Sequence, residues 1–326
     1  MKSKSLLIIG GTGFFGKSIL DYFQNYNLLK IKKIIIFSRR RQNIQINKIS
    51  KKKIKVIKIS GNILNIKKLP RADYVIYAAI LKNYDQDLKA VKNYLNLSLK
   101  YHLSSKILFV SSGAIYGVQK SKIKEFKEDY LDKYKKINFK NGYKKKYSDI
   151  KLKSENLFKE LGNKGLKVSI ARCFSFVGRY LPQNSHYVIG NIINNILRNK
   201  DINIKANYRI IRSYMYSDDL VRWLLKILDN SNNRCPVFNV GSNNKISIHK
   251  IANLLAKKYC LKILSSKKFS KKIDNYIPNT DKAKRELNLV INNTSLEAIQ
   301  KTINFYLKNS AKENEVKLTR KFKDIF

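Results

Sequence analysis

The chain has 326 residues, of which 68 are Lys or Arg and 22 are Asp or Glu, so its formal net charge at pH 7 is +46. Hydrophobic residues make up 44% of the chain and aromatic residues 11%, which excludes a disordered, collagen-like or low-complexity protein. At roughly 150 residues per domain, this length predicts two lobes, or one α/β domain with a large appendage.

The positive charge makes nucleic acid the first partner to consider, because Lys and Arg neutralise phosphates. The lysines are spread along the whole chain, with clusters at 30–33, 51–58, 144–146 and 267–272, and they form no single basic arm. This distribution is typical of a solvated surface in a chain rich in Lys, Asn and Ile. We therefore expect no nucleic-acid partner, although the charge should attract small anions.

The sequence predicts no membrane span, no disulfide framework and no metal site. The apolar run 6–9 is too short for a signal peptide, and the run 74–81 is far below the about 18 residues of a membrane span. The three cysteines, Cys173, Cys235 and Cys260, include no Cys-x-x-Cys pair, and the three histidines are far apart in the chain. These features predict a soluble, cytoplasmic protein in a reducing environment.

Short β-rich runs alternate with amphipathic helical stretches through residues 1–172, which is the pattern of βαβ units around a parallel sheet. Strands are predicted over residues 5–9, 33–38, 54–59, 73–79, 106–112 and 166–172, and helices over 14–26, 85–102 and 147–161. Six such strands are enough for a doubly wound sheet, so we assign residues 1–172 to a first domain of the α/β class.

The order of elements changes after residue 172, which predicts a smaller C-terminal α/β lobe over residues 173–326. A helix is predicted over 187–198, strands over 201–204 and 209–212, a helix over 217–228 and a strand over 237–240. Parts of 217–240 are expected to return to the first domain, with Trp223 in its core. Thr294 and Glu297 have capping-box spacing, which predicts a last helix reaching about residue 307.

A glycine-rich turn, Gly-Gly-Thr-Gly-Phe-Phe-Gly over residues 10–16, follows the first predicted strand and opens the first predicted helix. In this context the first glycine allows a tight turn, the next lets the backbone approach a pyrophosphate, and the last lets the helix pack closely on the sheet. Backbone N–H groups and the helix dipole would hold the anion. The turn predicts a Rossmann-type dinucleotide site, with a ligand-free turn as the alternative. The predicted cofactor contacts here are Gly10, Thr12, Gly13, Phe14, Phe15 and Gly16.

Ser38 ends the second predicted strand, where an NAD-selective site usually carries an acidic residue that binds the ribose 2′-OH. Arg39, Arg40 and Arg41 follow, and they could pair with a 2′-phosphate instead. We therefore expect NADP or NAD as the cofactor, with NADP favoured, and we place Ser38, Arg39 and Arg40 at the adenosine ribose.

Tyr147 and Lys151 lie one turn apart on one face of a predicted helix. A neighbouring cation favours the phenolate, so Lys151 and an oxidised nicotinamide together could lower the pKa of Tyr147 from about 10 toward neutrality. A solvated helix face is the alternative in a chain with 20 Tyr. Ser112 ends the fifth predicted strand, at the carboxyl edge where open α/β sheets bind their ligands.

Together these elements resemble the extended short-chain dehydrogenase/reductase family, which comprises NAD(P)-dependent nucleotide-sugar epimerases, dehydratases and reductases. The resemblance covers nearly the whole chain: the glycine loop, Ser-Ser-x-x-x-Tyr-Gly over residues 111–117, and Tyr-x-x-x-Lys-x-x-x-Glu at Tyr147, Lys151 and Glu155. It implies that Tyr147 is the acid/base at the sugar hydroxyl and that Lys151 binds the nicotinamide ribose. Ser112 would hydrogen-bond the reacting oxygen.

The same resemblance implies further binding residues. Residues 61–63 look like the family's adenine-contacting turn, and residues 75–79 like the strand that lines the cofactor. Arg212 would meet the substrate diphosphate, where a guanidinium suits bidentate contacts. The implied cofactor contacts are Asn62, Ile63, Ala78 and Ala79, together with Tyr147 and Lys151; the implied substrate contacts are Ser175, Asn191 and Arg212.

Three departures from the family pattern bear on the reaction. The family's 4,6-dehydratases carry an Asp-Glu pair after the catalytic Ser or Thr, whereas this chain has Gly113 and Ala114. Ser175 stands where many members carry Asn beside the substrate phosphates. Ala206 and Tyr208 lie where a glycine-containing turn is common.

We therefore predict a nucleotide-sugar epimerase that acts through a transient keto sugar. An NADPH-dependent nucleotide-4-keto-sugar reductase is the close alternative, and Gly113 and Ala114 disfavour a 4,6-dehydratase. A non-catalytic Rossmann-type protein that binds RNA is the alternative from another class. The resemblance also suggests a homodimer formed by helices 85–102 and 147–161, although the lysines of these helices would have to face away from the interface.

Overall fold

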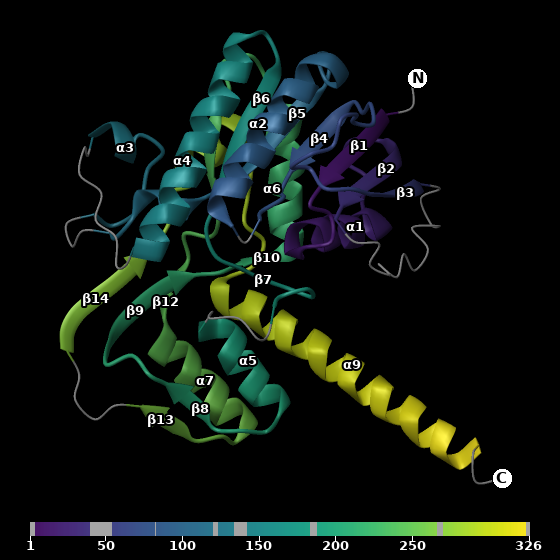
Figure 1. The fold of residues 1–326 in the computed structure, drawn as a ribbon. Coiled ribbons are helices and arrows are strands. Elements are labelled where there is room, and N and C mark those ends of the chain that lie inside the picture. Colours follow the sequence, from purple (N-terminus) through teal and green to yellow (C-terminus); the bar gives the residue numbers. More distant parts are fainter. Residues whose placement is uncertain are drawn as a thin grey trace.

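A computed structural model describes residues 4–39, 54–81, 83–119, 123–133, 142–182, 188–265 and 270–323 of the chain. Its main feature is a seven-stranded sheet with the order β11-β6-β5-β4-β1-β2-β3, in which every neighbouring pair is parallel (Figure 1). The strands are β1 (Lys4–Ile9), β2 (Ile31–Ser38), β3 (Lys55–Ser60), β4 (Tyr74–Tyr77), β5 (Lys106–Ser112), β6 (Lys167–Cys173) and β11 (Val237–Val240).

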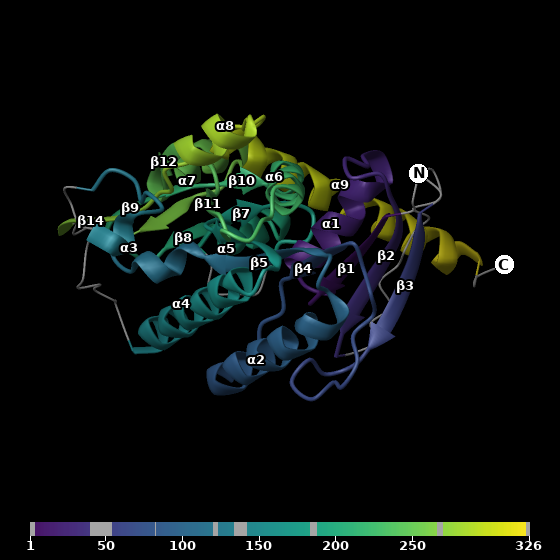
Figure 2. The same cartoon turned by 90° about the horizontal axis from the view of Figure 1, so that it is seen from above.

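Helices cover both faces of this sheet, because successive side chains of a buried parallel strand point to opposite faces and both sets are apolar. One face carries α2 (Tyr84–Tyr101) and α4 (Gly142–Asn163), and the other carries α1 (Phe14–Asn25) and α6 (Ser217–Asp229), as Figure 2 shows. In β1, Leu6 packs on the α1/α6 side and Leu7 on the α2/α4 side. The predicted doubly wound parallel sheet is confirmed.

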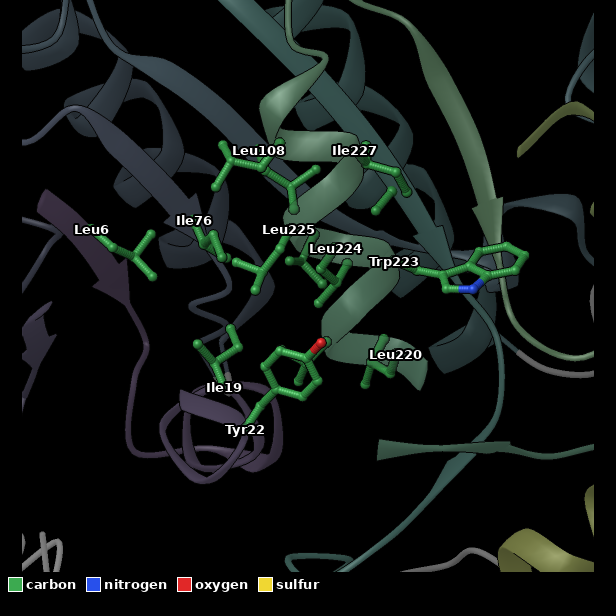
Figure 3. Packing of buried hydrophobic residues seen from close by; sticks show 14 of the residues in the cluster. Leu6, Ile19, Tyr22, Ile76, Leu108, Leu220, Trp223, Leu224, Leu225 and Ile227 are labelled. Atoms are coloured by element: carbon green, nitrogen blue, oxygen red, sulfur yellow. The ribbon is translucent and has the colours of Figure 1, made fainter. Parts of the chain in front are cut away.

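Helix α6 forms the centre of the core on its side of the sheet (Figure 3). Leu224 and Leu225 of α6 pack against side chains of the central strands and of α1, and both are fully buried. Trp223 is also fully buried, and its indole N–H donates to the Val290 carbonyl at 3.0 Å. The core position predicted for Trp223 is confirmed.

The second lobe has its own small sheets and helices below the carboxyl edge of the main sheet (Figure 1). Its elements are β7 (Phe176–Val177), α5 (Val188–Leu197), β8 (Ile202–Ile204), β9 (Tyr208–Ser213), β10 (Met215–Tyr216), β12 (Lys245–Ser247), α7 (Ile248–Tyr259), β13 (Ile263–Ser265), β14 (Ser270–Tyr276) and α9 (Ser295–Lys323). A three-stranded sheet has the order β12-β9-β14, with β9 and β14 parallel. This pairing brings β14, which the sequence did not predict, toward the main sheet's edge.

Three short helical segments complete the described elements: η2 (Gly113–Tyr116), α3 (Tyr130–Lys133) and α8 (Asp281–Leu287). Helix α8 packs on β11 and places Ala283 and Leu287 in the core of the main sheet. Helix α4 begins at Gly142, five residues before the predicted start, and α9 continues beyond the predicted end near residue 307. None of the described helices is both long enough and apolar enough to cross a bilayer.

Candidate active site

The glycine loop joins β1 to α1 as the sequence predicts. Gly10 has φ +90°, and a Cβ there would lie 2.7 Å from the Ala79 backbone. A Cβ at Gly16 would lie 2.3 Å from Gly11, so the fold itself requires glycine at these two positions. At Gly13 a Cβ would meet only ordinary contacts, at 3.6 Å from the Gly10 carbonyl oxygen. The fold leaves room at Gly13, which fits the close approach of a bound phosphate group.

A cavity of about 170 Å³ opens beside this loop at the carboxyl ends of β1, β2 and β4. It is lined by eight of the predicted cofactor residues, together with Gly61, Ile80 and Leu81 among others. The eight are Gly10, Thr12, Gly13, Ser38, Arg39, Ile63, Ala78 and Ala79. The shape and place of this cavity fit the adenosine end of a dinucleotide, because open α/β sheets bind such ligands at this edge.

Phe14, Phe15 and Asn62 are predicted cofactor residues that are not among the described residues lining this cavity. Phe14 and Phe15 turn their rings toward Phe176 of β7, with centroid distances of 6.5 and 5.9 Å, so only their backbone at the start of α1 faces the loop. The Asn62 side chain accepts a hydrogen bond from the Leu64 N–H at 3.2 Å and thereby stabilises its own turn. Arg40 lies outside the described residues, as does Arg41.

Ser112, Tyr147 and Lys151 meet where β5 ends and α4 begins. The Ser112 hydroxyl lies near the Tyr147 phenol and lowers its pKa, and the Ser112 Oγ accepts a hydrogen bond from the Ala114 N–H at 3.2 Å. Ser148, next to Tyr147, donates to the Ala114 carbonyl at 3.1 Å, which fixes α4 against η2. Lys151 is buried, with its ammonium 5.2 Å from the centre of the Phe109 ring.

Burial determines the electrostatics of this cluster in the protein without cofactor. Burial raises the pKa of Tyr147, although the Ser112 hydrogen bond lowers it. Burial also lowers the pKa of Lys151. Without cofactor, loss of solvation disfavours the phenolate and the ammonium alike. The lowering of the Tyr147 pKa by Lys151 together with an oxidised nicotinamide stays a prediction.

Asp87 of α2 is a buried carboxylate at this cluster that the sequence did not single out. It is 2% exposed and accepts a hydrogen bond from the Leu81 N–H at 2.9 Å. Burial raises the pKa of Asp87, and the Lys151 charge lowers it. The Asp87 charge in turn raises the pKa of both Lys151 and Tyr147. A charge on α2 therefore acts on the two residues that α4 supplies.

A buried ion pair holds α4 against the sheet. Arg172 of β6 donates to Glu155 of α4, with 2.9 Å between Nη2 and Oε2, and both side chains are at least 95% buried. Ser111 of β5 donates to the same carboxylate at 2.5 Å, and the Arg172 Nη1 donates to the Tyr116 hydroxyl at 2.8 Å. Because Glu155 lies one turn after Lys151, this network fixes the helix face that carries Tyr147.

The second lobe brings Arg212 and Tyr276 to the same region. Arg212 of β9 is paired across the strands with Tyr276 of β14, and its guanidinium lies 5.9 Å from the Tyr276 ring centre. Arg212 also forms an ion pair with Asp274, with 3.0 Å between Nη2 and Oδ2. Ser112 lowers and Tyr147 raises the pKa of the Tyr276 phenol, so Tyr276 lies beside both residues. Neither Asp274 nor Tyr276 was predicted, because no local spacing links β14 to the motifs of the first domain.

The remaining predicted substrate residues are less closely tied to the cluster. Ser175 lies two residues after β6, and its carbonyl accepts from the Met215 N–H at 3.1 Å. Asn191 lies on the exposed side of α5. Within the described residues, no hydrogen bond joins Asn191 to Ser175 or Arg212.

The fold and this cluster define a Rossmann-type nucleotide-binding protein with a serine, a tyrosine and a lysine at the ligand edge of its sheet. The family model of the NAD dependent epimerase/dehydratase family matches residues 6–241. The chain therefore belongs to that family, and the resemblance noted in the sequence is confirmed.

Individual relatives are more distant. The bifunctional polymyxin resistance protein ArnA of Wigglesworthia glossinidia brevipalpis is 26% identical over 94% of this chain, which spans 52% of that protein's length. Among solved structures, the UDP-glucose 4-epimerase of Thermotoga maritima with UDP-glucose has a TM-score of 0.75 at 20% identity, covering 94% of this chain and 99% of that one. The dTDP-glucose 4,6-dehydratase of Bacillus anthracis in complex with NAD also has a TM-score of 0.75, at 19% identity, covering 95% and 98%. These structures share the fold.

Proposed function

We propose that this protein is a nucleotide-sugar epimerase that acts through a transient 4-keto sugar. The observation that carries the proposal is the meeting of Ser112 at the end of β5 with Tyr147 and Lys151 of α4, at the same sheet edge as the glycine loop. Membership of the epimerase/dehydratase family and the fold shared with a UDP-glucose 4-epimerase support the substrate class.

The residues of the cluster have distinct roles in this proposal. A bound oxidised nicotinamide would supply the hydride acceptor for C4 of the sugar. Tyr147 takes the proton of the C4 hydroxyl, Ser112 donates a hydrogen bond to the same oxygen, and Lys151 binds the nicotinamide ribose. Return of the hydride to the other face of the keto carbon would invert C4. Alternatively, loss of the proton beside the carbonyl and reprotonation from the opposite face would invert a neighbouring carbon before the hydride returns to C4. The positive charge of the oxidised cofactor opposes the effect of burial on the pKa of Tyr147.

The packing around Gly113 supports an epimerase over a 4,6-dehydratase. A Cβ on Gly113 would lie 2.7 Å from the ring of Phe174, so this ring occupies the space that a side chain at position 113 would need. Ala114 likewise has no acidic group. The two positions therefore provide neither an acid nor a base for the elimination of water.

For the cofactor we propose the glycine-loop residues at the pyrophosphate and NADP in preference to NAD. Arg39 lines the cavity and is exposed, and the cavity-lining residue that ends β2 is Ser38 instead of an acidic residue. A guanidinium at this place suits a 2′-phosphate. Because NADPH commonly serves reduction, Arg39 also favours the second candidate, a nucleotide-4-keto-sugar reductase. Tighter binding of NAD than of NADP would argue against the preference for NADP and against the support that Arg39 gives to the reductase.

For the substrate we propose that Arg212 binds the diphosphate from the second lobe, residues 173–326, with Ser175 and Asn191 as further contacts. The Arg212 Nη1 donates to the Ile211 and Asp274 carbonyls, and its Nη2 donates to the Asp274 carboxylate. The proposed contact with an anion would therefore use the Nε–H and the second Nη2 hydrogen. We also propose a cytoplasmic location, which the three free cysteines support.

A substrate screen tests the proposal. The protein is loaded with NAD or NADP and incubated with UDP-, GDP-, CDP- and dTDP-linked sugars, and the products are followed by NMR. We expect one sugar to be epimerised, and Tyr147→Phe to lose at least about a hundredfold in turnover while it binds cofactor as before. Unchanged turnover of Tyr147→Phe would refute the mechanism. Selective RNA binding without any turnover would favour the non-catalytic alternative.

A further inference from the structure

Asn93 of α2 is a polar side chain that the sequence did not single out, and it is bonded to the segment that follows β3. Its Nδ2 donates to the Ile63 carbonyl at 2.9 Å and to the Ile66 carbonyl at 3.0 Å. A side-chain amide nitrogen has two hydrogens, so both are used here. Because two carbonyl oxygens can only accept, this arrangement needs a donor group on α2 and fixes which way the amide points.

The segment that Asn93 holds is a compact turn in the connection from β3 to β4. The N–H groups of Asn65 and Ile66 donate to the Asn62 carbonyl at 3.1 and 3.0 Å. The Asn62 side chain accepts from the Leu64 N–H at 3.2 Å. These three bonds close the turn on itself, and none of them reaches another element. The two bonds from Asn93 attach the turn to α2.

One residue of this turn forms part of the wall of the cofactor cavity. Ile63 is 3% exposed and lines the cavity together with Gly61. It also belongs to the same buried apolar cluster as Val91 and Tyr94 of α2. Apolar packing is non-directional, whereas a hydrogen bond defines both a distance and a direction. The bond from Asn93 to the Ile63 carbonyl therefore determines where this part of the wall lies.

The same connection is attached to the α2 region a second time, through His102 at the C-terminal end of the helix. The Nε2 of His102 lies 3.0 Å from the Pro70 carbonyl oxygen. Since a carbonyl only accepts, Nε2 carries the hydrogen of this bond. His102 is fully buried, and the described lining of the cavity includes neither His102 nor Pro70. The connection thus has one attachment at the cavity and one away from it.

We propose that Asn93 is a positioning residue for the cofactor, which holds the turn 62–66 on α2 so that Ile63 shapes the cavity for the adenosine end. The inference rests on the cofactor site of the function proposed above, and it does not depend on which sugar is turned over. Asn93 is not among the described residues that line the cavity, so it acts through the Ile63 backbone. Without its two bonds the turn would be less ordered before binding, and the need to order it would weaken the binding of the cofactor.

The affinity of the protein for ADP-ribose tests this proposal. ADP-ribose carries the adenosine and the diphosphate but no nicotinamide, so its binding reports on this end of the site without any turnover. Asn93→Leu removes both donors at similar size, and we expect the Kd from isothermal titration calorimetry to rise about tenfold. Asn93→Asp keeps the shape of the side chain but loses the amide donors, and it should weaken binding as well. Asn96→Leu, which changes an exposed residue of the same helix, should not. An unchanged Kd in both Asn93 variants, or no binding of ADP-ribose to the unmodified protein, would overturn the proposal.

His102→Leu separates positioning of the cavity wall from a general loss of stability. It removes the other attachment of the same connection, so it should lower the thermal stability but leave the Kd for ADP-ribose unchanged. An equal rise of the Kd in His102→Leu and Asn93→Leu would contradict the proposal. At saturating cofactor, Asn93→Leu should recover the kcat of the unmodified protein, and a kcat that stays low would contradict a role confined to cofactor binding. If the Kd changes as expected but no nucleotide sugar is turned over, the proposed function fails while the role of Asn93 stands.

Discussion

In the proposed mechanism Tyr147 has to release a proton near neutral pH, although burial raises the pKa of its phenol. Two neighbouring groups shift the pKa of Tyr147 in opposite directions. The Ser112 hydrogen bond lowers the pKa, and the buried carboxylate of Asp87 raises it. Asp87 also raises the pKa of Lys151 against the larger effect of burial, and so favours the ammonium form that the proposed contact with the cofactor needs. Asp87 therefore favours a charged lysine at the expense of an acidic tyrosine.

Replacing Asp87 should shift the pH dependence of turnover. Asp87→Asn keeps an oxygen that can accept from the Leu81 N–H but removes the negative charge, so the pKa of Tyr147 should fall. Since oxidation of the sugar needs the phenolate, the rising limb of kcat/KM against pH should move to lower pH by about half a unit to one unit. Asp85→Asn changes an exposed carboxylate of the same helical turn and should leave the profile in place. A limb that moves to higher pH in Asp87→Asn would contradict this account.

The sequence predicts the individual site residues only where they belong to a local pattern. Tyr147 and Lys151 follow from i, i+4 spacing, and Ser112 from its place at a strand end. Asp87 and Tyr276 belong to no such pattern, because α2 and β14 reach the site only through tertiary packing. The effect of burial on the pKa of Tyr147 could not be predicted for a related reason: the spacing to Lys151 is visible in the sequence, but the burial of both side chains is not.

At the scale of elements, the position of α4 depends on charges buried between the helix and the sheet. Glu155 is fully buried and accepts from Arg172 and Ser111, so β6 and β5 are joined to the helix that carries Tyr147. An uncompensated charge at such a place is costly, because neither group can be solvated once its partner is removed.

Glu155→Gln should therefore destabilise the protein strongly. It removes the buried ion-pair partner of the Arg172 guanidinium, which we expect to lower the free energy of unfolding by about 3 kcal/mol or more. Chemical denaturation followed by circular dichroism measures this change. The matched control is Glu286→Gln, which removes the exposed pair of Glu286 with Arg285 and should have no measurable effect. Equal stability of Glu155→Gln and the unmodified protein would show that the buried pair does not hold α4.

The sequence predicts the helices and strands whose apolar residues recur at a regular spacing, and it misses those without such a spacing. The six strands of the first domain are apolar runs between helices with regular apolar faces, and all six are found. By contrast, β12 and β13 have three residues each, and β14 carries Ser270, Lys271 and Lys272 at its exposed start. Strand β12 pairs with β9, and β13 pairs with β8. These partners are distant in the chain, so a short stretch of sequence cannot predict the pairing.

For the molecule as a whole, the charge of +46 affects every encounter with an anion and with a second copy of the chain. The proposed dimer would join α2 and α4 of two protomers in a four-helix interface. The outward faces of these helices carry exposed lysines: Lys89 and Lys92 on α2, and Lys153 and Lys159 on α4. Like charges across this interface would repel, and salt would screen them.

The proposed homodimer should therefore form more tightly as the ionic strength rises. Sedimentation velocity at micromolar protein concentration, in low and in high sodium chloride, measures the distribution of monomer and dimer. Lys153→Glu should favour the dimer at low salt, because it replaces a repulsive pair by an attractive one. A monomer at every salt concentration would refute the proposed dimer.

The parallel sheet and its two layers of helices could be predicted at this scale, since alternating strands and helices leave few other arrangements. The position of β11 beside β6 places the chain segment after α6 back in the main sheet. The packing of α8 on β11 was not predicted, because the seven residues of this helix are too few to show a clear apolar face.

The central step of the proposed mechanism is the oxidation of the sugar at C4. The hydride leaves the carbon for the nicotinamide, and Tyr147 takes the proton from the hydroxyl oxygen of the same carbon. Stopped-flow absorbance in the band of reduced nicotinamide tests it directly, with protein loaded with oxidised cofactor and mixed with the nucleotide sugar found in the screen. We expect a transient rise in the absorbance of reduced nicotinamide in the unmodified protein and no such rise in Tyr147→Phe. Product formation without any reduced cofactor, or an equal rise in Tyr147→Phe, would contradict it.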